Sequence, residues 1–241
     1  LPPKYALEKM LPDHFILWRP RDIVSGDFYW MTEKENTLVL AAIDCTGHGV
    51  PGAFMSMLGI AFLNEIVNKM AVNKHIQSLQ ASEILNQLRQ HVIHSLHQTG
   101  ALDEMKDGMD VALCVIDFET NQLQYAGAQN PLYIVRNGKG IEHEADGMPI
   151  GIYKGGEIPF TNHEIPIYSG DALYISSDGY ADQFGGPKGM KFMTKRFKEL
   201  LVNIHNRPMS EQKDILENTI EEWKGGLDQL DDMLVIGFKY T

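Results

Sequence analysis

The chain changes from strand to helix within the segment LVLAAIDCTGHGVP, residues 38–51. It opens with an uninterrupted apolar run, which is typical of a short buried strand. The run stops at Asp44, and a glycine-rich turn follows. Pro51 then begins a segment with apolar residues at helical spacing up to about Met70, and proline is favoured in the first turn of a helix. We therefore predict a buried strand that delivers Asp44 to a turn, with a long helix behind it.

The other predicted elements do not alternate as strand and helix, as they would in a parallel sheet. A second helix is expected over Ser82–His97, where apolar residues recur along one face, and a third from Ser210 to the glycines at 225–226. Strands are expected at 111–118, 122–125, 132–135, 172–176 and 233–238, from their short apolar runs. This order favours an α+β layered architecture with sheets and helices segregated.

Length and composition indicate one domain with a sizeable core. The chain has 241 residues, 44% of them hydrophobic and 22% charged, without repeats or low-complexity linkers. We assign residues 1–241 to a single domain and interpret residues 1–14 as the end of a linker from an upstream region.

Charge, hydropathy and cysteine content exclude several classes of function. The formal net charge of -11 argues against nucleic-acid binding, which needs basic surface. No run approaches 18 consecutive apolar residues, so we expect no direct membrane contact. Two cysteines are too few for a disulfide scaffold, and we expect them to be reduced and the domain to be cytoplasmic.

Aspartates recur at the ends of predicted strands. Asp44 and Asp178 each follow a strand and precede a glycine, Asp231 precedes the last strand, and Asp27 precedes the first strand-like stretch. A carboxylate at a strand end is held rigidly yet can reach a ligand. Oxygen-only ligands suit Mg²⁺ or Mn²⁺, and a pair of such cations can activate water against a phosphate ester. Spacing alone leaves open the alternative that these residues cap turns and helices.

Four motifs carry a resemblance to a known family. They are SGDFY at 25–29, IDCTGHG at 43–49, YISSDG at 174–179 and DDM at 231–233. In this order they resemble the PPM protein phosphatases, and within them the bacterial SpoIIE-type branch, over nearly the whole chain. The resemblance implies an α-β-β-α sandwich of two central antiparallel sheets flanked by helices. It also implies hydrolysis of phosphoserine or phosphothreonine on a bacterial signalling partner by metal-activated water.

The resemblance further implies a centre of two divalent cations, Mn²⁺ or Mg²⁺. Asp44 would bridge the two cations, and the backbone carbonyl of Cys45 would be a further ligand. Asp178 and Asp231 would hold one cation, and Asp27 the other, directly or through water. Asp44 and Asp178 are thereby the residues on which catalysis depends most.

Other residues are weaker candidates for the same site. Asp232 replaces Asp231 if the last motif is shifted by one residue. Asp107 and Asp110 are candidate ligands of a third cation, and Arg19 and Arg21 are candidate phosphate-binding residues. His48, in the glycine-rich turn, is a candidate general acid, because the pKa of histidine lies near neutrality. A structural hydrogen bond within the turn is the alternative role for His48.

The substrate class and the partner remain open at this point. In the branch that the chain resembles, the substrate is often a small phosphorylated STAS-type regulator of a partner-switching pathway. The resemblance also leaves room for a homodimer, and for a domain within a longer, membrane-anchored sensor protein. Two alternatives are a metal-dependent hydrolase of a small phosphorylated molecule and a regulatory module that binds a partner without turnover.

Overall fold

Two five-stranded antiparallel sheets face each other in the computed structural model, which describes residues 4–72, 79–101, 107–156 and 158–241. The first sheet has the order β1 (His14–Arg19), β12 (Met233–Lys239), β9 (Ala172–Ser176), β6 (Leu132–Arg136) and β7 (Lys139–His143). The second has the order β2 (Phe28–Lys34), β3 (Thr37–Cys45), β4 (Met109–Asp117), β5 (Gln122–Ala128) and β8 (His163–Pro166).

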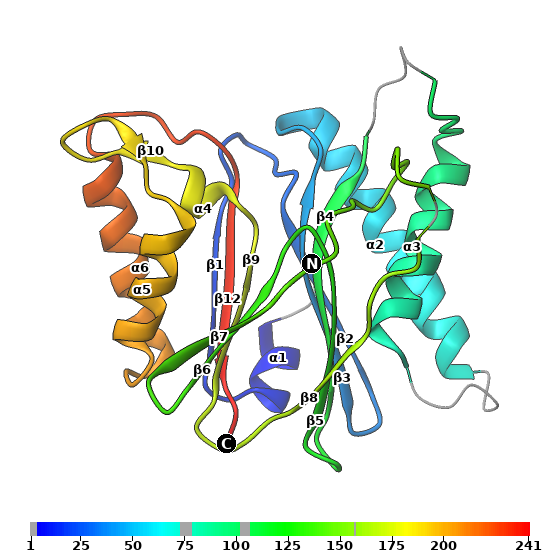
Figure 1. Cartoon of the computed structure of the whole chain (residues 1–241), viewed down its shortest axis with the longest axis horizontal. Coiled ribbons are helices and arrows are strands. Elements are labelled where there is room, and N and C mark those ends of the chain that lie inside the picture. Colours follow the sequence, from blue (N-terminus) through cyan, green and yellow to red (C-terminus); the bar gives the residue numbers. More distant parts are fainter. Residues whose placement is uncertain (1–3, 73–78, 102–106, 157) are drawn as a thin grey trace.

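Helices cover the outer face of each sheet (Figure 1). The helices α2 (Gly49–Val72) and α3 (Ala81–Ser95) pack against the second sheet, and α5 (Thr194–Ile204) and α6 (Met209–Lys224) pack against the first. A short helix, α4 (Gly179–Asp182), and a small hairpin of β10 (Phe184–Gly185) and β11 (Met190–Lys191) follow β9. The predicted α-β-β-α sandwich is confirmed.

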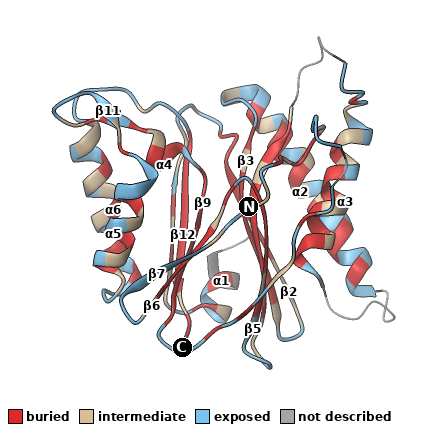
Figure 2. Cartoon of the chain, viewed as in Figure 1, coloured by how far each residue is buried: buried red, intermediate tan, exposed pale blue. Residues whose placement is uncertain are grey.

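Strand β3 explains why the sequence showed an unbroken apolar run. Leu38, Leu40 and Ala42 point into the core between the sheets. The alternate residues Val39 and Ala41, with Ile43, belong to the core beneath α2 and α3. Because successive side chains of a strand point to opposite faces, a strand covered on both faces has no polar alternation. Figure 2 shows this burial along the central strands of both sheets.

The N-terminal segment belongs to the fold. Helix α1 (Lys4–Met10) lies between the two sheets at one end (Figure 1). Leu7 is 1% exposed and Leu11 2% exposed, and both belong to the core between the sheets. These leucines therefore pack as part of the domain, and the interpretation of residues 1–14 as the end of a linker stays a prediction.

Helix α2 combines unusual length with an apolar composition. Within the described residues it is the one helix long and apolar enough to cross a membrane, and 39% of its apolar window is buried inside the structure. Leu63, Ile66 and Val67 are buried in the core beneath the second sheet. We interpret α2 as a core helix, because its buried side chains pack against α3 and the sheet.

Candidate metal centre

An acid-lined cavity of about 240 Å³ lies at one end of the sandwich. Its lining comprises Asp44, Cys45, Thr46, Gly47, His48, Asp110, Asp178 and Asp231. The ends of β3 and β9 and the beginning of β12 meet at this end, at the top of Figure 1. Each sheet therefore contributes carboxylates to one cavity, as the strand-end positions of these residues suggested.

Asp44 and Asp110 are direct partners across the β3–β4 ladder. Like charges directly opposite each other in a sheet are destabilising. Burial and the charges of Asp27 and Asp178 raise the pKa of Asp44 to about 10. Burial, together with Asp178, raises the pKa of Asp110 to about 6. In the absence of a cation, the folded protein therefore disfavours the ionised form of both carboxyl groups.

Asp27 lies behind Asp44 and is buried, with 2% of its surface exposed. Its Oδ2 accepts a hydrogen bond of 2.5 Å from the Ser177 hydroxyl, and Asp44 lies within hydrogen-bonding reach. Burial raises the pKa of Asp27 to about 7, although the bond from Ser177 opposes this shift. Asp27 is not among the residues that line the cavity.

Asp178 sits where β9 ends and the four-residue helix α4 begins. Burial and the neighbouring carboxylates of Asp182 and Asp231 raise the pKa of its side chain. The next residue, Gly179, passes so close to β12 that a Cβ there would lie 1.9 Å from the carbonyl oxygen of Asp232. Glycine at this position therefore lets the loop with Asp178 approach the start of β12.

The adjacent Asp231 and Asp232 have different surroundings. Asp231 lines the cavity. Asp232 is 3% exposed, and its two carboxylate oxygens accept hydrogen bonds of 2.7 Å from the backbone N–H groups of Arg21 and Gly26. Asp232 thus fastens the loop between β1 and β2, and the geometry favours Asp231 over Asp232 as the ligand.

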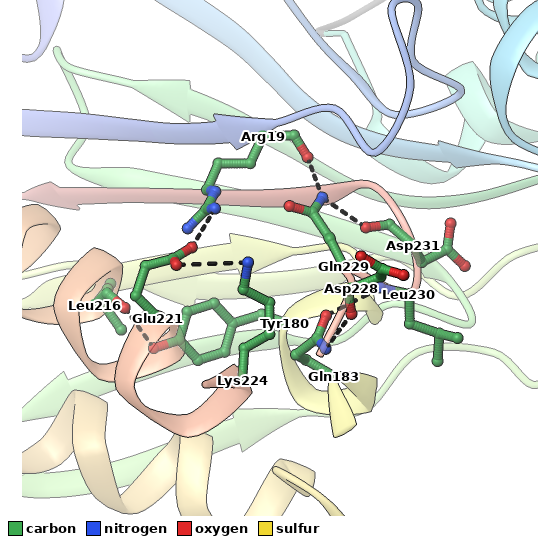
Figure 3. A network of polar contacts seen from close by, with 10 residues as sticks. All are labelled: Arg19, Tyr180, Gln183, Leu216, Glu221, Lys224, Asp228, Gln229, Leu230 and Asp231. Atoms are coloured by element: carbon green, nitrogen blue, oxygen red, sulfur yellow. Dashed lines mark hydrogen bonds and ion pairs between the residues drawn. The ribbon is translucent and has the colours of Figure 1, made fainter. Parts of the chain in front are cut away.

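A network of amide side chains holds the loop that leads to Asp231 (Figure 3). The Gln229 amide donates hydrogen bonds of 2.8 Å to the carbonyl oxygens of Arg19 and Asp231. The Gln183 side chain accepts a bond from the Leu230 N–H and donates one to the Asp228 carbonyl, each at 3.0 Å. These bonds fix the backbone next to Asp231 and leave its side chain at the cavity.

The glycine-rich turn after β3 is tied to neighbouring backbone. Gly47 has a positive φ of 84°, and a Cβ on Gly52 would lie 2.2 Å from the Gly47 carbonyl oxygen. Thr46 and Gly108 exchange two hydrogen bonds of 3.0 Å. The Cys45 side chain is buried, its Sγ accepts a contact from the Ser56 hydroxyl at 3.9 Å, and burial raises the pKa of its thiol. This agrees with a contribution of Cys45 through its backbone.

Both candidate phosphate-binding arginines have partners within the protein. The Arg19 guanidinium donates to Glu221 of α6, on the side away from Asp231 (Figure 3). Arg21 donates to the Leu230 carbonyl oxygen at 2.9 Å. Neither arginine is among the residues that line the cavity, and a role for them in binding phosphate stays a prediction.

Of the remaining candidates, Asp110 and His48 line the cavity and Asp107 does not. Asp107 does not line the cavity, and its backbone carbonyl accepts a bond from Gln98, whereas Asp110 is in the lining. His48 lines the cavity, and its Nδ1 lies 2.8 Å from the Oδ2 of Asp22. This partner could not be predicted from the sequence, because the contact joins two loops that only the folded chain brings together.

The carboxylate side chains of the cavity are suitable ligands for divalent cations, but they do not form a compact set of ligands around one point. In the part of the chain that the structure describes, no three His, Cys, Asp or Glu side chains form a group that could hold a metal ion. Mg²⁺ commonly binds through one or two carboxylates and keeps several waters, so a complete protein cage is not required. Cations would also relieve the repulsion that raises the pKa of Asp44.

Comparisons with known proteins agree with this arrangement. The family described as Stage II sporulation protein E (SpoIIE) matches residues 34–241. A Stage II sporulation protein E of Priestia megaterium is 26% identical over 215 residues, which are 88% of this chain and 33% of that protein. The chain thus spans about a third of the length of this curated relative.

Two solved structures share the fold. The SiaA-PP2C domain of Pseudomonas aeruginosa is 32% identical with a TM-score of 0.86, covering 99% of this chain and 91% of that chain. The PP2C phosphatase domain of SpoIIE from Bacillus subtilis, with a fragment of its regulatory domain, is 20% identical with a TM-score of 0.73. That match covers 95% of this chain and 63% of the other. This chain belongs to the SpoIIE family and has the fold of its PP2C-type phosphatase domains.

Proposed function

We propose that this chain is a metal-dependent serine/threonine protein phosphatase. The observation that carries the proposal is the meeting of Asp44 from one sheet with Asp178 and Asp231 from the other in a single cavity. No Lys or Arg is among the residues that line this cavity. A phosphate group could not approach these carboxylates without cations between them.

The chain's own oxygens would hold the cations. Asp44, the Cys45 carbonyl, Asp178 and Asp231 would hold the cations, and Asp27 would contribute directly or through water. When bound, the cations supply Lewis-acid activation of water and neutralise charge on the phosphoryl oxygens. The protein's part is to hold these carboxylates in place and to orient the phosphate ester for attack in line with the leaving oxygen.

The shape of the cavity favours a phosphorylated protein over a free small molecule. Sites for small molecules are mostly apolar and enclose most of the ligand. This cavity is small and acidic, and Asp178 and Asp231 are exposed at its edge. Phe54 and Met57, on the first turns of α2 beyond the site, are 65% and 67% exposed and offer apolar contact area. The partner we propose is a phosphorylated signalling protein of the STAS type.

Hydrolysis of a phosphoserine peptide in the presence of Mn²⁺ or Mg²⁺ tests the proposal. We expect metal-dependent release of phosphate that stops on chelation and is lost in Asp44→Asn. Asp214→Asn, which neutralises an exposed aspartate on α6, is the matched control and should keep full activity.

Two outcomes would overturn the proposal. Faster turnover of free nucleotides than of phosphopeptides would indicate a small-molecule hydrolase. Metal binding without hydrolysis of any phosphorylated peptide or protein would indicate a partner-binding module.

A further inference from the structure

A second cavity, of about 370 Å³, opens at the edge of the sandwich where the edge strands β1 and β2 lie. We call it the edge cavity, and residues of α1, β1, β2 and α6 line it. Among the described residues, it shares no lining residue with the acid-lined cavity. Cavities of this size bind small molecules in many proteins. The chemistry of its walls therefore indicates which ligand it could hold.

The edge cavity exists because the inner face of β1 is only partly covered. Successive residues of a strand point to opposite faces. Phe15 and Leu17 point outward and are buried in the core beneath α5 and α6. The alternate residues His14, Ile16 and Trp18 line the edge cavity, and none of the three is fully buried. The face of β1 that the sandwich should close is thus open at this edge.

Aromatic and apolar side chains form the walls. Tyr29 and Met31 of β2, which belong to the core between the sheets, line the edge cavity together with Trp18 of β1. The Trp18 indole N–H donates a hydrogen bond of 3.0 Å to the Asp27 carbonyl oxygen, which holds the ring in place although 36% of the residue is exposed. Walls of this kind suit an aromatic ligand, because contacts between rings are favourable in offset and edge arrangements.

The hydroxyl of Tyr29 is a polar group without a partner in this wall. Tyr29 is 7% exposed, and its hydroxyl forms no hydrogen bond with any residue that the structure describes. It is not among the buried polar atoms that protein encloses, so it is open to the cavity that Tyr29 lines. Burial raises the pKa of Tyr29, which keeps the phenol protonated and able to donate. A ligand in the edge cavity would therefore need a hydrogen-bond acceptor for Tyr29.

The first turn of α6 supplies the positive charge of the edge cavity. Ser210 and Lys213 line it, and residues three apart lie on the same side of a helix. The N-terminus of a helix favours anions, as does the lysine. The ion pair of Lys213 with Glu217 is long, at 3.8 Å. We propose that the edge cavity binds a small amphipathic molecule with an aromatic body, an anionic group at Lys213 and a hydrogen-bond acceptor for Tyr29.

A smaller cavity on the same sheet offers a matched comparison. It has a volume of about 160 Å³, and Lys198 and Tyr133 are among its lining residues. Here the lysine is already engaged, because Lys198 lies 2.6 Å from Glu142 and 4.9 Å from the centre of the Tyr133 ring. Lys198 therefore serves as the control for Lys213.

Three related probes separate the groups that recognise the ligand. Hydroxynaphthoate has an aromatic body with a carboxylate on one ring and a hydroxyl on the other. Naphthoate lacks the hydroxyl, and naphthol lacks the carboxylate. NMR titration of the full chain with each probe measures its affinity. We expect saturable binding of all three, with hydroxynaphthoate the tightest.

Two variants should each weaken a different pair of probes. Lys213→Gln should weaken hydroxynaphthoate and naphthoate about 2–5-fold and leave naphthol unchanged, because only the carboxylates lose an ionic partner. Tyr29→Phe should weaken hydroxynaphthoate and naphthol about 3–10-fold and leave naphthoate unchanged, because only the hydroxyls lose a hydrogen bond. Lys198→Gln should change none of the three affinities.

A filling variant locates the probes independently of their polar groups. Ile16→Trp places a larger side chain in the edge cavity and should abolish the binding of all three probes, with thermal unfolding as the check that the variant is folded. Binding should persist in chelator and in Asp44→Asn, so a failure of the proposed phosphatase function leaves this result intact. No saturable binding of hydroxynaphthoate, unchanged binding in folded Ile16→Trp, or losses that ignore the carboxylate and hydroxyl of the probe would overturn the proposal.

Discussion

The carboxylates at the two ends of strand β9 have opposite surroundings. At the beginning of the strand, Asp171 is 2% exposed, and the Arg136 guanidinium donates to its two oxygens at 2.8 and 2.7 Å. The N–H of Tyr168 donates a third bond at 2.9 Å. At the other end, Asp178 faces a cavity shared with Asp44 and Asp231, and no arginine or lysine lines that cavity.

The difference separates a structural carboxylate from a ligand-binding one. A buried charge needs a partner of opposite sign, and at Asp171 the chain supplies it. At the cavity the acids lie beside one another, and burial together with their charges raises the pKa of Asp44. The chain pairs Asp171 with an arginine but places no lysine or arginine in the lining of the cavity. We infer that the carboxylates of the cavity bind cations from solution. Substituting Asp171 and substituting an acid of the cavity should therefore have opposite effects on the stability of the metal-free protein.

The largest expected effect is on activity. Asp44→Asn should reduce turnover more than ~100-fold, since even residues that only support a metal ligand contribute 10–100-fold. The same variant should raise the melting temperature of the metal-free protein, because folding near neutral pH no longer requires protonation of Asp44, whose pKa is raised by burial and by the neighbouring acids. Steady-state kinetics and thermal unfolding in chelator measure the two effects. A metal-free variant less stable than wild type would contradict the comparison.

Asp171→Asn should have the opposite effect on stability. Removing one member of a buried ion pair leaves Arg136 without its partner, and such changes cost about 3–5 kcal/mol. We expect a loss near the lower figure, since the Arg136 side chain remains 25% exposed. Urea unfolding measures the loss, and phosphatase activity should persist at temperatures where the variant is folded. Unchanged stability would show that this end of β9 is no different from the other.

Asp231 and Asp232 show the same contrast between a cavity carboxylate and a structural carboxylate within one loop. Asp232→Ala removes two acceptors of buried backbone N–H groups and should cost about 2 kcal/mol of stability. Asp231→Ala should leave metal-free stability nearly unchanged and weaken Mn²⁺ binding. Unfolding in chelator and metal titration of both variants measure this. A reversal of the two phenotypes would place the ligand at Asp232.

The smallest effect concerns pH. The pKa of Asp27 is about 7 in the folded chain and near 3.8 when unfolded. Between these values the folded state binds more protons than the unfolded state, so stability falls as pH rises. Metal-free protein should therefore lose stability between pH 5 and pH 8. Mn²⁺ should suppress this loss. Melting temperatures across this range test the sign, and a rise with pH would contradict it.

The core strands could be predicted because their burial is visible in composition. Strand β3 is apolar on both faces, and its last residues, with Asp44, therefore stood out. Strands β7 and β8 could not be found this way. The sequence KGIEH of β7 is mostly exposed at a sheet edge, and β8 is short and ends in Pro166. Pairing with a neighbouring strand, rather than local pattern, decides their structure.

In the site, too, residues within a local motif could be predicted and long-range contacts could not. Asp44, Asp178 and Asp231 were predictable, because each stands at a strand end within a motif. The bond from Ser177 to Asp27 joins residues 150 positions apart, and the contact of His48 with Asp22 joins two loops. No pattern within one segment reports such contacts. The contact of Arg19 with Glu221 of α6 is likewise invisible in the sequence around Arg19.

Counting the metal ions bound to the chain tests the central claim most directly. Equilibrium dialysis of purified wild type and Asp44→Asn against Mn²⁺, with Asp214→Asn as control, gives the number of ions per chain. We expect two ions in wild type and in the control, and loss of at least one ion in Asp44→Asn. Equal stoichiometry and affinity in all three proteins would contradict the assignment of this cavity as a metal centre.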